Sequence, residues 1–552
     1  MEWLGEMKNW TLVDLIDRAV QGYPKREAVV FKDRRIRYEE LGKQVDALAG
    51  GLMRIGVKKG DKVAVWLSNS PEWIVSEFAI IKAGAVIVPL SSRLKGYDLS
   101  YILKQSDSTT LIIMDHFLKN SYIDILTELL PDFPNSKPGF LNNQSFPLLK
   151  NIICTSEKKY SGLYSLKEIM EKVSEVPLAK ELKERSTSLN PDDVVNLPYT
   201  SGTTGFPKGV LTTHRQYIGE ISVFKERFAL QDGDRFLAPA PFFANFGNYF
   251  GVLIPILVGG CTVPLEAFDP EQCLRLIEQE RCTHISGTPT MYQDILGHAR
   301  FSEYDVSSLR TGMTGAAPAS VQMIQDVRSK MGIQIICNGY GMTENSGATT
   351  MTCASDALQV LANTTGKPFP DVQIRIIDTK TNEPLPSGSI GELCVKGWIV
   401  MKGYYKMPEE TQKCFDSEGW FHTGDLGYLD EGGNFCITGR HKDMFISGGQ
   451  NVYPTEIENF LYSFPKIKLV AVVDVSDDRL GEVGFAFVVL KEGEVSSEEE
   501  IKNYCREQIA NYKVPKYVKF IHDIPLAGVG KIQKFKLAEE AKEEVQRRKL
   551  GS

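Results

Sequence analysis

The sequence lacks several features that would place it in a simple class. Among ten cysteines there is no CxxC pair, and no cysteine–histidine group has zinc-site spacing. Basic residues do not predominate, because 63 Lys and Arg stand against 70 Asp and Glu. These absences argue against a disulfide scaffold, a zinc-ribbon protein and a broadly basic nucleic-acid binder. Free thiols and the missing basic, apolar leader predict a cytoplasmic protein.

An unbroken hydrophobic run is also missing. The stretch 236–265 carries no charged residue and is long enough to cross a bilayer. Four prolines interrupt it, and a broken helix would leave backbone groups unpaired in lipid. We therefore expect buried strand, loop and helix that line an apolar pocket rather than a transmembrane segment, although peripheral contact with a membrane stays open. The interrupting residues are Pro239, Pro241, Pro255 and Pro264.

Strand and helix signals alternate along the first two thirds of the chain. The segment 62–67 is typical of a buried strand, 71–83 of a helix and 85–90 of the next strand. Strands separated by helices predict an α/β protein with mostly parallel sheets. From 372 to 395, short alternating runs and turns predict a small antiparallel lobe. Further strands are expected at 110–114, 152–154 and 334–337, and the Pro-, Asn- and Ser-rich stretch 131–147 is expected to form a surface loop.

A domain boundary is expected near 439–443. It would divide a large, multi-lobed N-terminal domain, 1–440, from a small, mobile α+β domain, 441–552, and 552 residues are enough for several lobes. The hydroxyl and acidic residues at 496–500 are typical of a helix start, so a helix is expected to run to Ala510. The other elements expected here are strands at 444–447, 469–475, 483–490 and 517–522 and a helix after Lys531.

The most informative segment is 199–210, which reads YTSGTTGFPKGV. Its glycines let backbone N–H groups approach an anion, and its hydroxyls and Lys208 add donors and a positive charge. It differs from a Walker-type loop because Lys208 is followed by Gly209 rather than by Ser or Thr. The segment predicts a phosphate-binding loop, with an ordinary polar turn as the alternative.

This segment resembles the signature loop of the adenylate-forming superfamily, which includes acyl-CoA synthetases, luciferases and peptide-synthetase adenylation domains. Each further match is weak alone, but together they follow the family's order from Tyr199 to Lys531. The resemblance implies ATP and CoA as co-substrates and Mg²⁺ as cofactor. The further matches are GAAP at 315–318, GYGMTE at 339–344, TGD at 423–425, GR at 439–440, GGQNVYP at 448–454 and GK at 530–531.

The chemistry of such an enzyme needs fixed positive charge. A carboxylate becomes a good acyl donor when it attacks the α-phosphate of ATP, because AMP is then the leaving group, and cations stabilise the crowded phosphorus. One unit charge about 4 Å from another, at an effective dielectric near 20, contributes on the order of 4 kcal/mol, which is roughly a thousandfold in rate. The resemblance makes Lys531 that cation, Thr343 a phosphate donor and Glu344 the Mg²⁺ ligand. The plain alternatives are a solvated lysine and a capped helix start.

The resemblance also implies a nucleotide pocket. Tyr340 would stack on adenine, Asp425 would accept both ribose hydroxyls, and Arg440 would assist at the ribose or phosphate. A core turn and a surface ion pair are the respective alternatives. The complete expected set is Thr200, Ser201, Gly202, Thr203, Thr204, Gly205, Lys208, Gly315, Ala316, Ala317, Gly339, Tyr340, Gly341, Met342, Asp425 and Arg440.

The resemblance further implies a movement of the small domain. Lys442 stands at the family's hinge position, and rotation there would exchange Lys531 for the loop of Gly448 and Gly449. The two glycines would line a channel for the slim pantetheine arm of CoA, unless they form a simple β-turn.

One position departs from the family pattern. The run 241–247 has Ala244 where relatives usually carry a histidine beside the acyl pocket and the thiol entrance. Phe243 and Phe246 flank it, and the uncharged surroundings favour an apolar acid. The loss of the histidine also removes any ground for carrying over the family's gating.

We therefore expect an acid–CoA ligase acting on a medium- or long-chain fatty acid, with aryl or alicyclic acids as the second choice. A luciferase, or a ligase that loads a carrier protein, is possible within the same chemistry, although no carrier domain follows the last motif. Rivals from other classes are a nucleotide-binding regulator that has lost catalysis and a membrane transporter. The acid and the chain length are left open, and so is the oligomeric state, for which a homodimer is one option.

Overall fold

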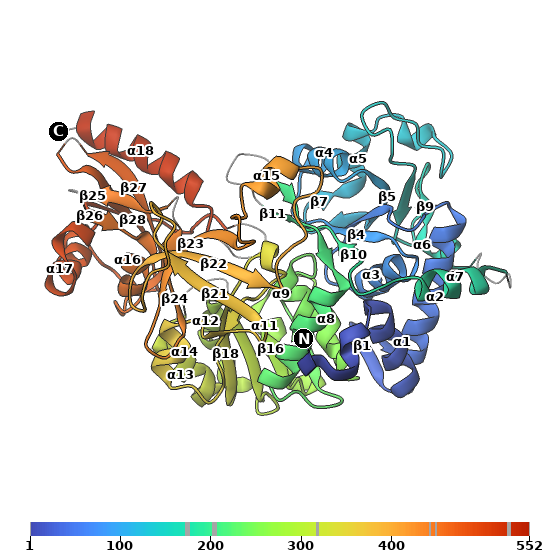
Figure 1. Ribbon diagram of the computed structural model, residues 1–552, viewed down its shortest axis with the longest axis horizontal. Helices are drawn as coiled ribbons and strands as arrows, with labels where there is room; N and C mark the ends of the chain where they lie inside the picture. Colours follow the sequence, from blue (N-terminus) through green and yellow to red (C-terminus); the bar gives the residue numbers. More distant parts are fainter. Residues whose placement is uncertain are drawn as a thin grey trace.

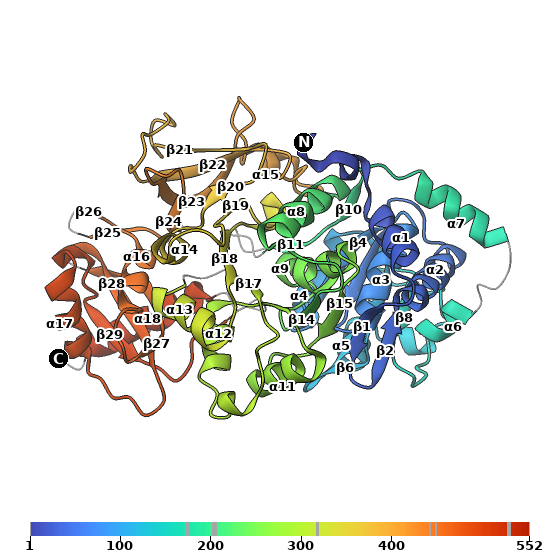
Figure 2. The ribbon, with the colours of Figure 1, turned by 90° about the horizontal axis from the view of Figure 1, so that it is seen from below.

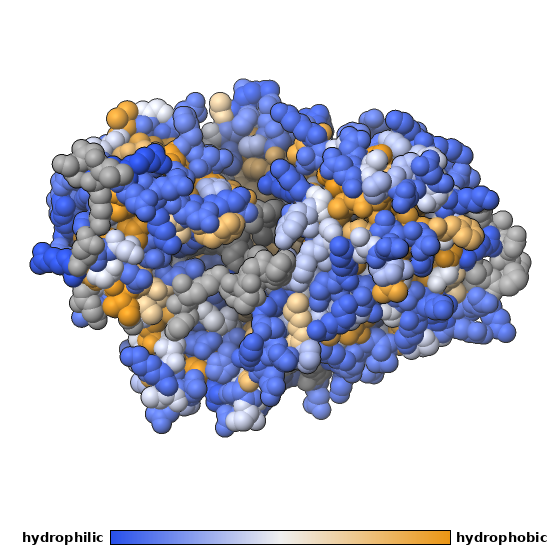
Figure 3. All heavy atoms as spheres, turned by 90° about the horizontal axis from the view of Figure 1, so that it is seen from above, coloured by the Kyte–Doolittle hydropathy of each residue, from blue (hydrophilic) through white to orange (hydrophobic). Residues whose placement is uncertain are grey.

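The computed structural model confirms the expected fold class: parallel sheets and their helices form a large N-terminal part, and an antiparallel lobe and a small α+β part follow (Figure 1). None of the helices in the described part of the chain combines the length and hydropathy needed to cross a membrane. On the face seen in Figure 3, hydrophilic residues predominate. The structure describes residues 2–171, 177–200, 207–315, 319–440, 443–447, 450–477, 479–526 and 532–550.

A seven-stranded sheet occupies the N-terminal lobe, in the order β13-β10-β4-β3-β5-β8-β9. Its central strands run parallel, and β3 is buried along 63–66 because both faces are covered by helices. Pro71 opens the crossover helix, and Ser70 caps it by accepting from the Trp73 amide. The strands are β3 (Lys62–Trp66), β4 (Val86–Pro89), β5 (Ser108–Ile113), β8 (Asn151–Cys154), β9 (Tyr164–Ser165), β10 (Val194–Asn196) and β13 (Thr212–Thr213).

Helices of this lobe pack on both faces of the sheet and on one another (Figure 2). The stretch 131–147, expected to be a surface loop, contains no long element, but Phe133, Leu141 and Phe146 anchor it in a core. The helices are α1 (Leu12–Gly22), α2 (Tyr38–Arg54), α3 (Pro71–Lys82), α4 (Gly96–Gln105), α5 (Tyr122–Leu129), α6 (Leu166–Glu171), α7 (Pro177–Thr187) and α8 (His214–Arg227).

A nine-stranded sheet forms the second lobe, in the order β2-β1-β15-β14-β16-β17-β18-β19-β20. Six of its strands, from β1 to β18, are parallel neighbours. The strands are β1 (Glu27–Phe31), β2 (Arg34–Arg37), β14 (Arg235–Ala238), β15 (Cys261–Pro264), β16 (His284–Ser286), β17 (Thr311–Gly315), β18 (Ile335–Tyr340), β19 (Thr350–Met351) and β20 (Lys367–Pro368). The helices are α11 (Pro270–Glu280), α12 (Pro289–Leu296), α13 (Val321–Lys330) and α14 (Leu358–Asn363).

The uncharged stretch 236–265 is buried inside this lobe, as expected from its prolines. After β14 the chain forms α9 (Asn245–Asn248), a π-helical turn η3 (Tyr249–Leu253) and α10 (Ile254–Leu257), and it then enters β15. Gly247 is required here, because a Cβ atom would lie 2.1 Å from the carbonyl oxygen of Pro241. A π-helical turn often marks a functional site.

The antiparallel lobe is larger than the pattern at 372–395 indicated. Its sheet has the order β21-β22-β23-β24, and the last two strands come from residues beyond that stretch. The bounds are β21 (Val372–Ile377), β22 (Gly391–Gly397), β23 (Phe421–Leu429) and β24 (Phe435–Arg440), with α15 (Pro408–Gln412) between β22 and β23.

The C-terminal elements form their own sheet, in which β27 and β28 are the long central pair. Sequence patterns missed β26 and α16, and the division at residue 440 stays a prediction. The elements are β25 (Phe445–Ser447), β26 (Gln450–Val452), α16 (Pro454–Leu461), β27 (Ile467–Asp477), β28 (Gly481–Leu490), α17 (Glu498–Gln508), β29 (Tyr517–Phe520) and α18 (Lys534–Leu550).

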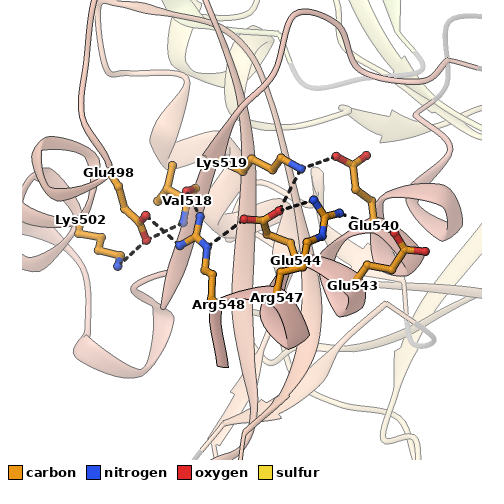
Figure 4. Close-up of polar contacts among 9 residues, drawn as sticks. All are labelled: Glu498, Lys502, Val518, Lys519, Glu540, Glu543, Glu544, Arg547 and Arg548. Atoms are coloured by element: carbon orange, nitrogen blue, oxygen red, sulfur yellow. Dashed lines mark hydrogen bonds and ion pairs between the residues drawn. The ribbon is translucent and has the colours of Figure 1, made fainter. Parts of the chain in front are cut away.

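Ion pairs fasten the last helix to this sheet (Figure 4). Lys519 of β29 contacts Glu540 of α18 at 2.8 Å, and Arg548 of α18 contacts Glu498 of the neighbouring α17 at 3.0 Å. The Arg548–Glu544 pair, at 3.2 Å, lies within α18. Each pair is partly exposed and contributes at most about 1 kcal/mol. Their sum orients α18, whose N-terminal end follows the segment that contains Lys531.

Candidate active site

Three residues predicted to bind the nucleoside meet in the structure. Tyr340 ends β18, Asp425 lies in β23, and Arg440 ends β24 directly opposite Asp425. The Tyr340 hydroxyl donates to Asp425 Oδ2 at 2.5 Å, and Arg440 Nε lies 2.9 Å from Asp425 Oδ1. Asp425 is 2% exposed. Both residues of the ion pair lie on strands and not in surface turns, with a buried carboxylate and a partly exposed guanidinium.

Burial, and then the neighbouring Asp425, raise the pKa of Tyr340 well above its ordinary value. Its hydroxyl therefore stays protonated and donates to the carboxylate. The ring packs edge-on against Phe435 with 5.2 Å between centroids. Stacking of this ring on adenine stays a prediction.

Glu344, the predicted Mg²⁺ ligand, lies in a short 3-10 turn, η5 (Thr343–Asn345), directly after β18. Its side chain is buried, and the Tyr404 hydroxyl donates to Glu344 Oε1 at 2.8 Å. The Met401 amide holds the Glu344 carbonyl at 2.8 Å. Burial, followed by the charge of Glu344, raises the pKa of Tyr404, so this phenol remains a donor. Tyr404 thus fixes the direction of the carboxylate.

Lys208 lies near the C-terminal end of the expected phosphate loop. The short strands β11 (Tyr199–Thr200) and β12 (Lys208–Gly209) pair across that loop, with Thr200 opposite Lys208. Lys208 Nζ lies 2.5 Å from Glu410 Oε2 of α15 and 4.9 Å from the centroid of the Tyr404 ring. Hydrogen bonding from Lys208 and Lys413 lowers the pKa of Glu410 to about 2. Lys208 and Glu344 thus approach the same tyrosine from two sides.

Sequence patterns gave no sign of Tyr404 or Glu410. Neither belongs to a motif recognised in the sequence, and Glu410 lies 202 residues from its partner Lys208. A short segment that is rich in tyrosine and glutamate is common on protein surfaces. Only the fold brings these side chains to the predicted phosphate loop.

The predicted acyl-pocket residues lie at the start of α9. Phe243, Ala244 and Phe246 are each partly exposed, and the Phe246 ring packs 5.6 Å from Phe250. Ala244 is the N-cap of α9 and makes no side-chain capping bond. The structure thus presents two aromatic side chains and a small residue at one helix end.

Of the expected adenine wall, Gly315 lies in the described part of the chain, beside the expected nucleotide-binding residue Gly339. Gly315 and Gly339 pair across β17 and β18. A Cβ atom at Gly341 would approach the Gly347 carbonyl oxygen to 2.0 Å, so that position admits no side chain. Met342 is the N-cap of η5. The expected residues outside the described part of the chain are Ser201, Gly202, Thr203, Thr204, Gly205, Ala316, Ala317, Lys442, Gly448, Gly449 and Lys531.

One further group of possible metal ligands occurs among the described residues, formed by Glu392, Cys394 and His422. Glu392 accepts from the Gly424 amide at 2.9 Å and lies 3.1 Å from His422 Nδ1. Arg375 is the cross-strand neighbour of Cys394 on the other side. Its positive charge would repel a metal cation bound here, so we assign no metal to this group.

The fold and these groups define an adenylate-forming enzyme. The family model described as AMP-binding enzyme matches residues 16–405, and the model of the AMP-binding enzyme C-terminal domain matches residues 456–531. The chain therefore belongs to the AMP-binding enzyme family, and it is an acid–thiol ligase of the acyl-CoA synthetase type. The family and enzyme class expected from the sequence motifs are confirmed.

Particular relatives cover nearly the whole chain. The "Putative acyl-CoA synthetase YngI" of Bacillus subtilis (strain 168) is 43% identical over 97% of this chain and 98% of its own. Human mitochondrial medium-chain acyl-CoA ligase ACSF2 is 34% identical over 96% of this chain and 87% of its own. The crystal structure of the anthranilate CoA ligase AuaEII with anthranoyl-AMP superposes with a TM-score of 0.83 and 25% identity. The superposition covers 97% of this chain and 98% of AuaEII.

Proposed function

We propose that this enzyme activates a medium- or long-chain fatty acid as acyl-AMP and then transfers the acyl group to CoA. One observation carries this proposal: the Glu344 turn is hydrogen-bonded through the Ser346 carbonyl to α9, the helix that begins beside Phe243 and Phe246. The groups expected at the phosphates and those expected at the acid therefore adjoin. The names of YngI and ACSF2 support acyl-CoA formation and a medium chain length.

In the first half-reaction, a carboxylate oxygen attacks the α-phosphorus of ATP. The new bond is the acyl–phosphate bond, and the bond to the β-phosphate's bridging oxygen breaks, so pyrophosphate leaves. Asp425 would accept the ribose hydroxyls while Arg440 keeps its charge in place. Lys208 would face the phosphates, and Lys531 would lie between the carboxylate and the α-phosphate.

In the second half-reaction, the CoA thiolate attacks the acyl carbonyl carbon, and AMP leaves with the bonding electrons of its oxygen. The thiol proton leaves to solvent. We expect Lys442 to act as the hinge between the two half-reactions and Gly448 and Gly449 to line the CoA channel.

The residues present fit a magnesium ion. Glu344 offers a buried carboxylate, which is the hard oxygen ligand that Mg²⁺ prefers, and the Tyr404 hydroxyl holds one of its oxygens at 2.8 Å. When bound, the ion would neutralise phosphate charge. The Tyr404 hydroxyl orients the carboxylate of Glu344, and the Met401 amide holds its main-chain carbonyl.

The decisive experiment is a CoA-dependent AMP-release screen of straight-chain acids from acetate to palmitate, with benzoate and anthranilate added. We expect the highest kcat/KM for a straight-chain acid of medium or long chain, and acyl-CoA as the product by mass spectrometry. Anthranilate as the best substrate would favour the aryl alternative, which the likeness to AuaEII supports. No AMP release with any acid would refute the proposal.

The acceptor needs its own test. Acyl-AMP formed without CoA should be consumed on addition of CoA, whereas a pantetheinylated carrier protein or oxygen should leave it intact. Consumption by the carrier protein alone would make the enzyme a carrier-protein ligase.

A further inference from the structure

The turn that carries Glu344 is closed by a residue in an uncommon conformation. Ser346 has φ 61°, in the left-handed region that non-glycine residues rarely adopt, and it is 1% exposed. Its hydroxyl donates to the Ile399 carbonyl at 3.0 Å. Such a backbone persists only where its surroundings hold it. The groups that bind Ser346 therefore help to hold the turn that carries Glu344, two residues earlier.

Two side chains from the acyl side hold the Ser346 carbonyl. Asn245 Nδ2 donates to it at 2.6 Å, and the Tyr249 hydroxyl donates to it at 2.9 Å. Asn245 is the first residue of α9, and Tyr249 begins η3. Both lone pairs of this buried carbonyl are thereby used by one short helical segment.

The orientation of the Asn245 amide is fixed by a hydrogen-bond chain. Asn196 Nδ2 donates to the Tyr217 hydroxyl at 2.5 Å, and this hydroxyl donates to Asn245 Oδ1 at 3.2 Å. The Ser346 carbonyl can only accept, so it faces the amide nitrogen. The chain runs from β10 through α8 to α9 and ends on the Glu344 turn.

The same turn has no room to move toward α8. A Cβ atom at Gly347 would lie 2.6 Å from the Tyr249 ring, and the Ala348 amide donates to Glu220 Oε2 at 3.2 Å. The turn is thus enclosed by α8 and η3, and Asn245 connects it directly to α9, the helix that contains Phe246.

We propose that Asn245 is a positioning residue of the adenylation reaction: it holds the Ser346 carbonyl from the acyl-pocket helix and so places Glu344 for Mg²⁺ and the nucleotide phosphates. This inference rests on the proposed function, because it takes Glu344 as the Mg²⁺ ligand. A side chain on the helix beside the expected acyl pocket would thereby influence the binding of Mg²⁺ and the nucleotide.

The test compares nucleotide affinity with and without Mg²⁺, using α,β-methylene-ATP as the probe and no acid. In the wild type, 10 mM Mg²⁺ should tighten binding relative to EDTA. Asn245→Ala should reduce this Mg²⁺-dependent gain about tenfold and leave the affinity in EDTA unchanged. A purely structural loss would instead weaken binding equally under both conditions.

Two further variants complete the test. Tyr249→Phe removes the second donor to the Ser346 carbonyl, together with the contact of this hydroxyl with Glu220, and keeps the ring. It should reduce the Mg²⁺-dependent gain in the same direction, so the inference stays testable if Asn245→Ala does not fold. Phe246→Leu is the matched control, because it alters the same helix without a bond to Ser346. It should leave the Mg²⁺-dependent gain unchanged and raise only the KM for the acid.

The outcomes separate this inference from the proposed function. A full Mg²⁺-dependent gain in both Asn245→Ala and Tyr249→Phe would overturn the inference. A wild type that gains nothing from Mg²⁺ would overturn it together with the role of Glu344. A wild type that gains from Mg²⁺ yet activates no acid would overturn the proposed function alone.

Discussion

Replacing Asp425 by Asn tests the nucleoside site most directly. The substitution keeps the size of the side chain and removes its charge. In the wild type, one carboxylate oxygen accepts from the Tyr340 hydroxyl at 2.5 Å, and the other lies 2.9 Å from Arg440 Nε. An amide has only one acceptor oxygen, so its NH₂ group must face one of these two donors.

The expected loss of stability in Asp425→Asn follows from the burial of the ion pair. The Asp425 side chain is 3% exposed and that of Arg440 is 31% exposed. Removing one partner of a buried ion pair costs roughly 3–5 kcal/mol, and the partial exposure of Arg440 places the expected loss near the lower end, about 3 kcal/mol. Two hydrogen bonds from ribose hydroxyls to a charged acceptor contribute about 1.5 kcal/mol each or more, so AMP should bind at least about 100-fold more weakly.

Urea unfolding followed by tryptophan fluorescence measures the stability, and titration calorimetry measures AMP binding. Asp416→Asn is the matched control, because Asp416 pairs with Arg375 at 2.5 Å in the same lobe. We expect it to lower stability and leave AMP affinity unchanged. If Asp425→Asn bound AMP within threefold of the wild type, the assignment of Asp425 to the ribose would be refuted.

Three other substitutions probe separate parts of the enzyme. Lys531→Ala should abolish acid-dependent pyrophosphate release but spare thioester formation from synthetic acyl-AMP; equal loss of both half-reactions would contradict the domain movement. Tyr404→Phe should raise the Mg²⁺ concentration for half-maximal activity about tenfold, since one hydrogen bond orients Glu344; an unchanged Mg²⁺ dependence in steady-state assays would argue against this. Burial raises the pKa of Glu77 to about 7. This carboxyl loses its proton near pH 4.5 in the unfolded chain but only near pH 7 in the folded enzyme. The free energy of unfolding of the wild type should therefore fall as the pH rises from about 4.5 to about 7. Glu77→Gln should remove this fall in urea unfolding at pH 5 and 8, and a persistent fall would exclude Glu77 as its source.

Sequence patterns correctly predicted the elements whose signals lie in neighbouring residues, such as an apolar run or a helix-capping residue. The apolar run at 62–67 became β3, and Pro71 with Ser70 before it gave the start of α3. The prolines of 236–265 correctly indicated broken, buried elements. Patterns missed α16, whose start lacks a side-chain cap although Pro454 and Glu456 in its first turn are helix-start signals. They placed the end of the antiparallel lobe too early because a long connection, 398–420, separates β22 from β23.

The sequence by itself determined the family and the motif-borne residues, because glycine spacing, hydroxyl clusters and the order of short motifs are properties of neighbouring residues. Only the tertiary structure decided the partners: Glu344 with Tyr404, 60 residues away, and Ser346 with Asn245, 101 residues away. Such pairs follow from strand register and helix packing, in which many weak contacts across the whole core fix one arrangement. No pattern of neighbouring residues contains the combined effect of these contacts.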